Sequence, residues 1–265
     1  MGAHRRFLRH LAEVIPKGKR PIIVTDAGFR GPWFRAVEQL GWDFVGRIRR
    51  GVKYSVDDGE TWDFTNNLYR RAKFKMHYVG DAQVSLNKPY QGHLYLVRKN
   101  TKGHHRPCKR YGDDALAVLC RKLYKDPWLL VTSLAHGRGA GRRVGKIYAL
   151  RMQIEETFRD LKNGRWGFGL EYARSYHAER LENLLLIGTL AMFIVWLNGF
   201  LVKANKWTRH FQANTGPRRS ALSTFFLGQR LLCNRMLRCT RLQIDDAFRQ
   251  FSLSVEGQLK FVGIP

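Results

Sequence analysis

A run of β-branched residues near the start of the 265-residue chain limits its possible folds more than any other feature. Residues 22–24 read Ile-Ile-Val, which is typical of a strand buried on both faces of a parallel sheet. An amphipathic helix is predicted before this strand, at 4–15, and a second helix after it, at 31–41, with Pro near its start and Gly at its end. A second strand is predicted at 42–51. The order helix–strand–helix–strand predicts a crossover onto a parallel sheet and therefore an α/β fold.

The character of the sequence changes after residue 50. Short strand patterns separated by turn residues fill 51–135 and predict a mainly β insertion, with one helical pattern at 114–123. Residues 135–143 are rich in Gly and Arg and predict a flexible basic linker. The residues from 206 to 265 are basic and are predicted to be helical.

Residues 147–162 predict a helix whose charges lie in an unusual place. At about 100° per residue, four polar side chains fall within a band about 60° wide. They are Tyr148, Arg151, Glu155 and Lys162. Beside them runs an apolar stripe that we expect to be buried. It consists of Leu150, Ile154, Phe158 and Leu161. Because this polar row borders the buried stripe, we expect another group to contact it there. Glu156 and Asp160 fall on the far side and are predicted to be solvated.

A second helical segment is apolar enough to be considered as a membrane-spanning helix. Residues 184–202 are apolar except for Thr189 and Asn198, and the segment is long enough to span a bilayer. The alternative is a core helix buried on all sides. The charge and chemistry of the rest of the chain favour the core helix.

The chain is strongly basic. Lys and Arg number 47 against 21 Asp and Glu, so the net charge is +26 and the pI is about 10.5. A charge this large repels itself unless an anionic partner neutralises it, and nucleic acid is the leading candidate. An anionic membrane surface and ribosomal RNA are the other two.

The cysteines do not predict a metal site. None of the four forms a CxxC pair, and the cluster of His104, His105 and Cys108 has no second pair at ligand spacing. Reduced thiols in a cytoplasmic protein are the better interpretation, and no signal peptide is visible.

Two carboxylates are candidates for catalysis. Asp26 follows the predicted strand at 22–24, at the edge where open α/β sheets bind their ligands, although an N-cap for the next helix is the ordinary alternative. Glu155 lies on the polar row. Carboxylates brought together need a divalent cation, and oxygen ligands imply Mg²⁺ or Mn²⁺. Two such metals activate water in phosphodiester cleavage, with Arg151 and Lys162 placed to hold phosphates.

These residues resemble a known family. The spacing Tyr-x2-Arg-x3-Glu-x6-Lys is similar to the signature of DDE insertion-sequence transposases of the cut-and-paste type. The segment VTDAGF (24–29) resembles the segment that bears the second catalytic Asp of this family. The segments 151–162 and 210–215 resemble the tetracycline-resistance transposon subgroup of the IS-four-like family, and the resemblance covers nearly the whole chain.

The resemblance implies a fold and a set of site residues. The fold would be RNase H-like, with a discontinuous core (1–50 and 136–205), the β insertion (51–135) and a helical C-terminal region (206–265). Asp26 and Glu155 would be catalytic and would bind Mg²⁺ or Mn²⁺. The DNA-binding residues would be Tyr148, Arg151, Lys162, Trp128, Arg47 and Arg49. The protein would act on transposon ends and target DNA, through a DNA hairpin and as a dimer, in the bacterial cytoplasm at the nucleoid.

Three of these residues have ordinary alternatives. Trp128 would stack on a flipped base, but a buried strand tryptophan is the usual interpretation without the resemblance. Arg47 and Arg49 occupy alternate positions and so point one way, toward the DNA backbone or, equally, into solvent for solubility.

One expected residue has no counterpart. The family has a first catalytic Asp on a strand upstream, but Glu13 is the only acidic residue before Asp26 and lies in the predicted helix. We therefore expect an RNase H-like core without its first strands, in a chain that is incomplete or inactive as a nuclease. The alternative is a non-catalytic basic DNA-binding remnant that interferes with an intact transposase.

Overall fold

The computed structural model describes residues 2–98, 126–164, 168–212, 222–234 and 239–262. The chain divides into two compact units, Met1–Arg151 and Met152–Pro265, and each is described separately below. The predicted helix at 114–123 lies outside the described residues. The predicted boundaries at 51, 136 and 206 remain predictions.

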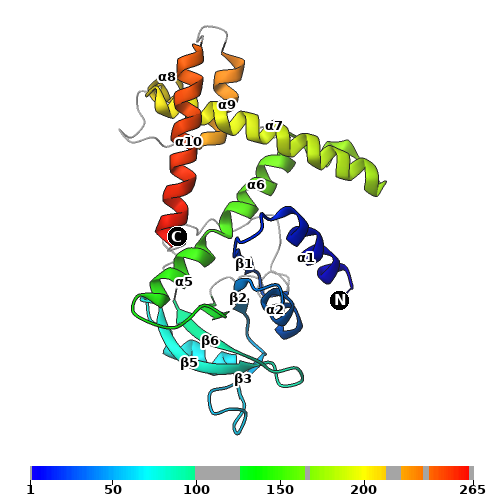
Figure 1. The fold of residues 1–265 in the computed structure, drawn as a ribbon, viewed down its shortest axis with the longest axis vertical. Helices are drawn as coiled ribbons and strands as arrows, with labels where there is room; N and C mark the ends of the chain where they lie inside the picture. The colour runs from blue at the N-terminus through cyan, green and yellow to red at the C-terminus, as the bar shows by residue number, and fades with distance from the viewer. Residues whose placement is uncertain (1, 99–125, 165–167, 213–221, 235–238, 263–265) are drawn as a thin grey trace, which may run out of the picture. The chain divides into compact units, whose positions relative to one another are not determined.

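The first unit is built on one seven-stranded sheet, in the order β1-β2-β7-β6-β5-β3-β4 (Figure 1). Its strands are β1 (Ile22–Thr25), β2 (Asp43–Ile48), β3 (Lys53–Ser55), β4 (Asp63–Phe64), β5 (His77–Val84), β6 (Tyr90–Val97) and β7 (Trp128–Thr132). Only the β1–β2 pair is parallel among the paired strands described. The predicted α/β class is confirmed, and the RNase H-like arrangement stays a prediction.

The helices near the N-terminus agree with the sequence pattern. Helix α1 (Gly2–Val14) packs against α2 (Gly31–Glu38), which covers β2 and β6. A proline in the first turn starts α2, and Gly41 follows its end at φ +74°, a left-handed conformation that favours glycine. The Phe34 ring stacks on Phe44 at 4.3 Å between ring centres. A Cβ at Gly46 would lie 2.7 Å from that ring, so glycine lets α2 approach the sheet.

Strand β1 is not buried as predicted. Residues 22–24 are only partly buried, because β1 is at one end of the described sheet and pairs only with β2 there. The expectation of burial on both faces is therefore wrong for the described molecule. Among the described residues β1 is therefore an edge strand, and edge strands can pair with additional strands.

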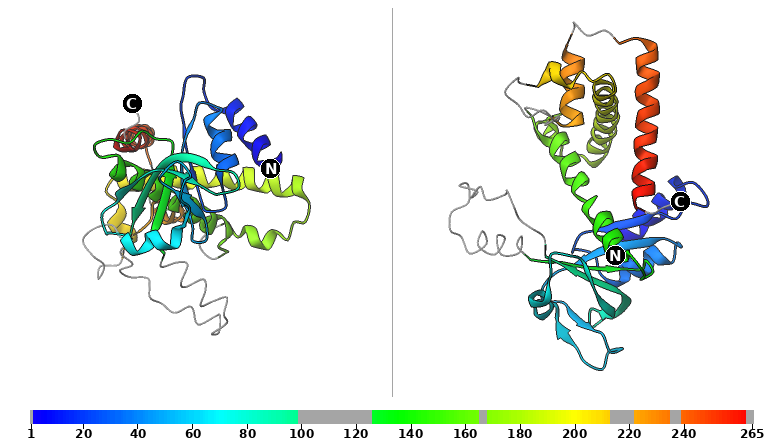
Figure 2. Two further views of the ribbon diagram at one scale, coloured as in Figure 1. Left: turned by 90° about the horizontal axis from the view of Figure 1, so that it is seen from below. Right: turned by 90° about the vertical axis from the view of Figure 1, so that its left-hand side faces the viewer.

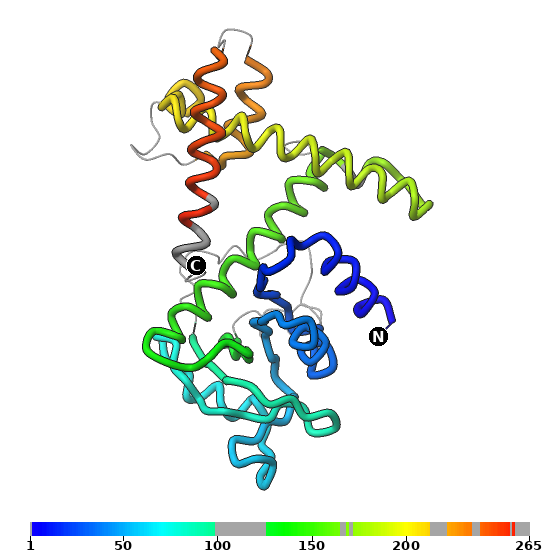
Figure 3. The backbone as a smooth tube through the Cα atoms, viewed as in Figure 1, coloured from blue at the N-terminus to red at the C-terminus, as the bar shows by residue number. Residues whose placement is uncertain are grey.

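The strands of the β-rich segment continue the main sheet. β7 lies between β2 and β6, so the chain returns from the β5–β6 hairpin to pair directly beside the strand that follows Asp26 (Figure 3). The register pairs Gly46 with Val131 and Leu94 with Val131. The described strands β3 to β7 lie within the predicted insertion, and the sequence did not predict that they share one sheet with β1 and β2.

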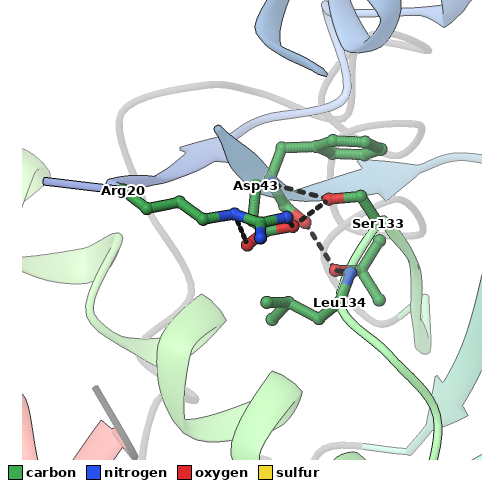
Figure 4. A network of polar contacts seen from close by, with 6 residues as sticks. Arg20, Asp43, Ser133 and Leu134 are labelled. Carbon is green, nitrogen blue, oxygen red and sulfur yellow. Dashed lines mark hydrogen bonds and ion pairs between the residues drawn. The ribbon is translucent and has the colours of Figure 1, made fainter. Parts of the chain in front are cut away.

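A network of polar contacts holds the N-terminal end of β2 in place (Figure 4). The Asp43 carboxylate lies 2.9 Å from Nε of Arg20 and accepts a hydrogen bond from the Ser133 hydroxyl at 2.9 Å. The same hydroxyl oxygen accepts a hydrogen bond from the Phe44 amide at 3.1 Å. Charge-assisted hydrogen bonds of this kind join the segment before β1, the start of β2 and the end of β7.

The loop between β3 and β4 contains an acid-sensitive carboxylate. The Asp57 carboxylate accepts hydrogen bonds from the Ser55 hydroxyl, at 2.5 Å, and from the Thr61 hydroxyl and amide. These bonds stabilise the ionised form and lower the pKa of Asp57 to about 2. Its contribution to stability is present above its ordinary pKa of 3.8 and is lost as the pH falls toward 2.

We predict that Asp57→Asn removes part of the acid sensitivity of the protein. The free energy of unfolding should differ between wild type and Asp57→Asn at pH 5, and the difference should shrink as the pH is lowered toward 2. Urea titrations followed by circular dichroism at several pH values measure this. Ser55→Ala, which removes the largest cause of the shift, should move the window to higher pH. A difference that stays constant from pH 5 to 2 would contradict the prediction.

The predicted helix at 147–162 is interrupted. Helix α5 (Ala140–Ala149) ends before a turn at residues 150 and 151, and α6 (Met152–Lys162) begins after it. The amides of Leu150 and Arg151 bond to carbonyls three residues back instead of four. The angular positions were derived for one continuous helix, whereas the structure has two helices joined by this turn. The predicted linker at 135–143 is also wrong from Ala140 onward, where α5 has started.

The second unit is helical where it is described. Its elements are α6 and the later α7 (Ala178–Ala204), α8 (Thr208–Phe211), α9 (Thr224–Cys233) and α10 (Arg241–Val262), with a short 3₁₀ helix at Leu170–Ala173. α9 and α10 both pack on α7 (Figure 2). The small core between them consists of Leu201, Val202, Leu227, Leu231 and Ala247.

Helix α7 is far more exposed than the sequence predicts. It is long and apolar enough to cross a membrane, and only 22% of its most apolar window is buried, so the expected all-round burial is wrong. Its contacts with α9 bury its C-terminal part, whereas Leu186 and Ile187 are more than half exposed. The two polar side chains, Thr189 and Asn198, donate hydrogen bonds to carbonyls four residues back in the same helix.

The apolar stripe of α6 is also mostly exposed. Leu161 is buried, but Ile154 and Phe158 are about half exposed. The predicted burial of this stripe is therefore confirmed only at Leu161. A stripe that looks like a core face in the sequence has few partners within the second unit.

Candidate functional site

Six of the predicted site residues gather at one edge of the sheet in the first unit. The carboxyl ends of β1 and β2 meet there because these strands are parallel, and β7 begins there because it is antiparallel to β2. The six residues are Asp26, Arg47, Arg49, Trp128, Tyr148 and Arg151. The remaining two, Glu155 and Lys162, lie on α6 in the second unit.

Asp26 directly follows β1. Its Oδ1 accepts a hydrogen bond from the Ala27 amide at 2.6 Å and lies 3.7 Å from Nη2 of Arg49. The side chain is 46% exposed, so the carboxylate is open to solvent beside a guanidinium group. The N-cap of α2 is Arg30, and the capping alternative for Asp26 is therefore wrong.

Arg47 lies in β2 and Arg49 directly follows it, and the two arginines differ in exposure. Arg47 is only 9% exposed, and its guanidinium donates a hydrogen bond to the Asp126 carbonyl at 3.5 Å. Its Nε has no hydrogen-bond partner among the described residues. A buried guanidinium does not act as a solubilising group, so that alternative is wrong for Arg47. Arg49, by contrast, is 44% exposed.

Tyr148 is the centre of this group. Its ring is buried, lies edge-to-face with Trp128 at 4.8 Å between ring centres, and has the Arg151 guanidinium 5.7 Å from its centre. Burial raises the pKa of Tyr148, while the positive charges of Arg47 and Arg151 lower it and the charge of Asp26 raises it. Tyr148 therefore stays a neutral phenol within the electrostatic reach of all three charged residues.

Trp128 occupies the first position of β7 and is half-buried. The indole packs nearly perpendicular to the Tyr148 ring, at 75° between the ring planes. The residue is thus neither a fully buried strand tryptophan nor a free surface side chain, and its role in base stacking stays a prediction.

An ion pair that the sequence analysis missed fixes the end of β2. Nε of Arg50 donates a hydrogen bond to Oδ2 of Asp126 at 2.8 Å, and Nη2 contacts Oδ1. The Asp126 side chain is only 5% exposed, and its hydrogen bond raises the pKa of Arg50. These two residues are far apart in sequence, so only the pairing of β2 with β7 brings them together.

The acidic residues of α6 are described within the second unit alone. Glu155 and Glu156 are exposed, which confirms the expectation for Glu156. Asp160 is only 28% exposed at its side chain, and burial raises its pKa, so the prediction that it is solvated is wrong. It lines a cavity of 500 Å³ together with Lys203, whose pKa is lowered by burial.

The described residues contain no group of three His, Cys, Asp or Glu side chains that could hold a metal ion. His104, His105 and Cys108, which the sequence analysis weighed as a zinc site, lie outside the described part of the chain. Cys233 and Cys239 are free thiols. A metal bound to Asp26 would therefore need further ligands that do not form such a group of three with it.

The fold and the site can be compared with known families. The first unit is an α/β unit with a half-exposed carboxylate after β1, with Arg49 beside it and with Arg47 and Arg151 near Tyr148. Residues 2–193 match the model of the transposase DDE domain family, and the chain belongs to this family. It is therefore a DDE-type transposase, and the members of this family are nucleases and strand transferases. The matched range contains all eight predicted site residues. No curated protein matches the chain.

Proposed function

We propose that this protein is a metal-dependent DNA transposase of the cut-and-paste type, in the IS-four-like family with the Tyr-Arg-Glu-Lys signature. The observation that supports it most is the family match over residues 2–193, which contains both Asp26 and Glu155. The clustering of arginines and Tyr148 around Asp26 supports it independently, because cleavage of a phosphodiester needs positive charge beside the metal-binding carboxylate.

Asp26 and Glu155 are the proposed ligands of Mg²⁺ or Mn²⁺. Their oxygens suit a hard cation, and Mg²⁺ is usually held by one or two carboxylates while water and substrate phosphates complete its shell. The half-exposed Asp26 carboxylate fits this requirement. When bound, the metal would supply water activation and stabilise the leaving oxygen. The Arg49 guanidinium forms an ion pair with Asp26, and we expect it to move away from the carboxylate when a metal binds.

The cationic residues are the proposed contacts to DNA phosphates. Arg47, Arg49, Arg151 and Lys162 would bind the backbones of transposon ends and target DNA, and Tyr148 would hold Arg151 in place. Trp128 would stack on a base that leaves the helix when a DNA hairpin forms. We further propose action as a dimer on DNA, in the bacterial cytoplasm at the nucleoid.

Cleavage by the 265-residue chain alone is not part of the proposal. Glu13, the acidic residue that precedes Asp26, lies on α1 with 74% of its side chain exposed and pairs with His10 at 3.8 Å. It does not resemble the first catalytic carboxylate. The alternative proposal is a non-catalytic protein that binds DNA without cutting it and so competes with an intact transposase for transposon ends.

Metal-directed cutting of the protein tests the ligand assignment without requiring activity. Fe²⁺ in place of Mg²⁺, with ascorbate and peroxide, generates radicals that break the backbone near a bound metal. We expect cuts around residues 26 and 155 in the presence of DNA, and their loss in Asp26→Asn and in Glu155→Gln. Both variants remove the negative charge of the carboxylate and replace one of its two oxygens by an amide nitrogen, while the volume is kept.

Glu156→Gln is the matched control for this experiment, because Glu156 neighbours Glu155 and is equally exposed. It should leave the cutting pattern unchanged. Cuts that persist in both ligand variants would contradict the metal assignment. Mg²⁺-dependent nicking of DNA by the purified chain, abolished by Asp26→Asn, would contradict the proposed inactivity.

A further inference from the structure

The cavity of 500 Å³ that Asp160 and Lys203 line belongs to the second unit alone. It is bounded by α6, α7 and the start of α9, and all of its described lining residues belong to this unit. None of them is among the eight predicted site residues. The volume is within the range of sites that enclose organic ligands. The proposed nuclease chemistry therefore leaves this cavity unexplained.

Helix α6 contributes a polar and acidic wall to the cavity. Four of its side chains follow the helical spacing of three and four residues and so share one face of the helix. They are Gln153, Glu156, Thr157 and Asp160. Burial raises the pKa of Asp160, Arg159 lowers it, and the like charge of Glu156 raises it. A cation placed beside the two carboxylates would stabilise the ionised form of both.

Lys203 brings a positive charge to another part of the wall. Its ammonium donates a hydrogen bond to the Thr224 hydroxyl at 2.5 Å, and it forms no ion pair with a carboxylate among the described residues. Burial lowers the pKa of Lys203, and no neighbouring carboxylate raises it again. Lys203 and the acidic pair on α6 therefore line one cavity without neutralising each other.

The remaining wall is largely aromatic. Phe193 and Trp196 of α7 line the cavity and are 47% and 40% exposed, so their rings have free surface. Both rings lie edge-to-face with Phe251 of α10, at 5.9 Å and 6.0 Å between ring centres, which limits their movement. Phe225 and Met192 complete this part of the wall. Such a surface suits an apolar group on a ligand.

The charges of the wall distinguish between classes of ligand. Two acidic and two basic side chains line the cavity, so the formal charge of its described wall is zero, in a chain of net charge +26. A nucleic acid strand carries one sign of charge, and the carboxylates would repel it. A simple cation or anion would use only one part of the wall. A ligand with groups of both signs and an apolar group uses all of it, and a short peptide has this chemistry.

We propose that this cavity binds a short segment of a partner protein in which a basic and an acidic residue flank an apolar one. Its basic side chain lies against Glu156 and Asp160. Its apolar side chain lies against Phe193 and Trp196, and its acidic side chain lies against Lys203. The inference is independent of the proposed action on DNA and adds a protein-docking site to the chain.

Binding of matched peptides to the full chain tests the proposal. The probe is a capped peptide of sequence Gly-Arg-Phe-Glu-Gly, which has no net charge. In titrations followed by saturation-transfer NMR, it should bind about tenfold tighter than Gly-Gln-Phe-Gln-Gly and than Gly-Arg-Gly-Glu-Gly. Gly-Glu-Phe-Glu-Gly measures the general attraction of anions to a basic protein, and it should bind more weakly than the probe.

Two variants assign the charged groups. In Asp160→Asn, a peptide with Arg should lose its advantage over the same peptide with Gln at that position. In Lys203→Gln, the advantage of Glu over Gln should be lost instead, so the two contacts are separated. The controls are Asp245→Asn and Lys206→Gln, which remove the same charges from exposed positions of this unit outside the cavity. Both controls should keep the two advantages.

The outcomes are separable from those of the proposed function, because no measurement includes DNA. Equal affinity for the charged and the neutral peptide would overturn the docking site, and so would affinities that neither cavity variant changes. Tightest binding of the doubly acidic peptide would reveal general attraction to a basic chain and would also overturn it. An advantage of Arg without any advantage of Glu would make the cavity a site for cations alone and overturn the assignment to a peptide with both charges.

Discussion

Replacing Gly228 by alanine should destabilise the second unit more than any other conservative change in its helices. A Cβ at this position would lie 1.8 Å from the Val195 carbonyl oxygen and 2.9 Å from the Gly199 amide nitrogen. Both are backbone atoms of α7, so no side chain can rotate away and the two helices must separate. Gly199 faces the reverse contact, with its Cβ 1.9 Å from the Thr224 carbonyl oxygen.

Separation of α7 and α9 would open the small core that they share. We expect Gly228→Ala to lower the free energy of unfolding by about 3 kcal/mol, the upper part of the range for overpacked sites. Its higher helix propensity offsets less than about 1 kcal/mol of this loss. Urea denaturation of the full chain, followed by circular dichroism, measures the change.

Gly257→Ala provides the matched control. Gly257 lies in α10, and a Cβ there would meet nothing within 4 Å. The same substitution should therefore stabilise the protein by about 0.5–1 kcal/mol. If Gly228→Ala were as stable as Gly257→Ala, the close approach of α7 and α9 would be contradicted.

Phe34→Ala should have the largest effect in the first unit. The Phe34 ring is fully buried, stacks on Phe44 and lies edge-to-face with Tyr90 at 5.3 Å between ring centres. Removing it leaves a cavity between α2 and the sheet that the neighbouring rings cannot fill. We expect a loss of about 3–5 kcal/mol in the free energy of unfolding.

Phe64→Ala is the control for the loss of an aromatic ring as such. Phe64 is 46% exposed at the edge of the sheet, so its removal leaves no buried cavity. Its replacement should cost less than about 1 kcal/mol. Thermal and urea unfolding of both variants measure the difference. Similar losses in the two variants would show that Phe34 is not the centre of the core between α2 and the sheet.

The first fifty residues illustrate how well local signals predict structure. The β-branched run at 22–24, the proline at the start of α2 and Gly41 at its end each act within a few residues, and both helices and both strands form where they indicate. Asp26 follows β1 as predicted. Its neighbours at the carboxyl ends of the strands could be predicted because two parallel strands end at the same edge.

The helix at 147–162 shows where such signals stop. Its periodicity is continuous in the sequence, yet two bonds that span only three residues, at Leu150 and Arg151, interrupt it. Side-chain periodicity measures which faces are apolar and contains no information on a backbone turn of this kind. The angular argument that placed Tyr148 and Glu155 on one row assumed an uninterrupted helix, so their common row stays a prediction, and the family match contains both residues.

Composition and short-range pattern determined the α/β class, the large positive charge and the carboxylate after the strand at 22–25, and they predict a β-rich middle and a helical end. They could not place β7 between β2 and β6, pair Arg50 with Asp126, bury Arg47 or leave α7 exposed. Each of these depends on contacts between segments that are distant in the chain. The free energy of such contacts is set by the shapes and charges of both partners, and no window of neighbouring residues contains both.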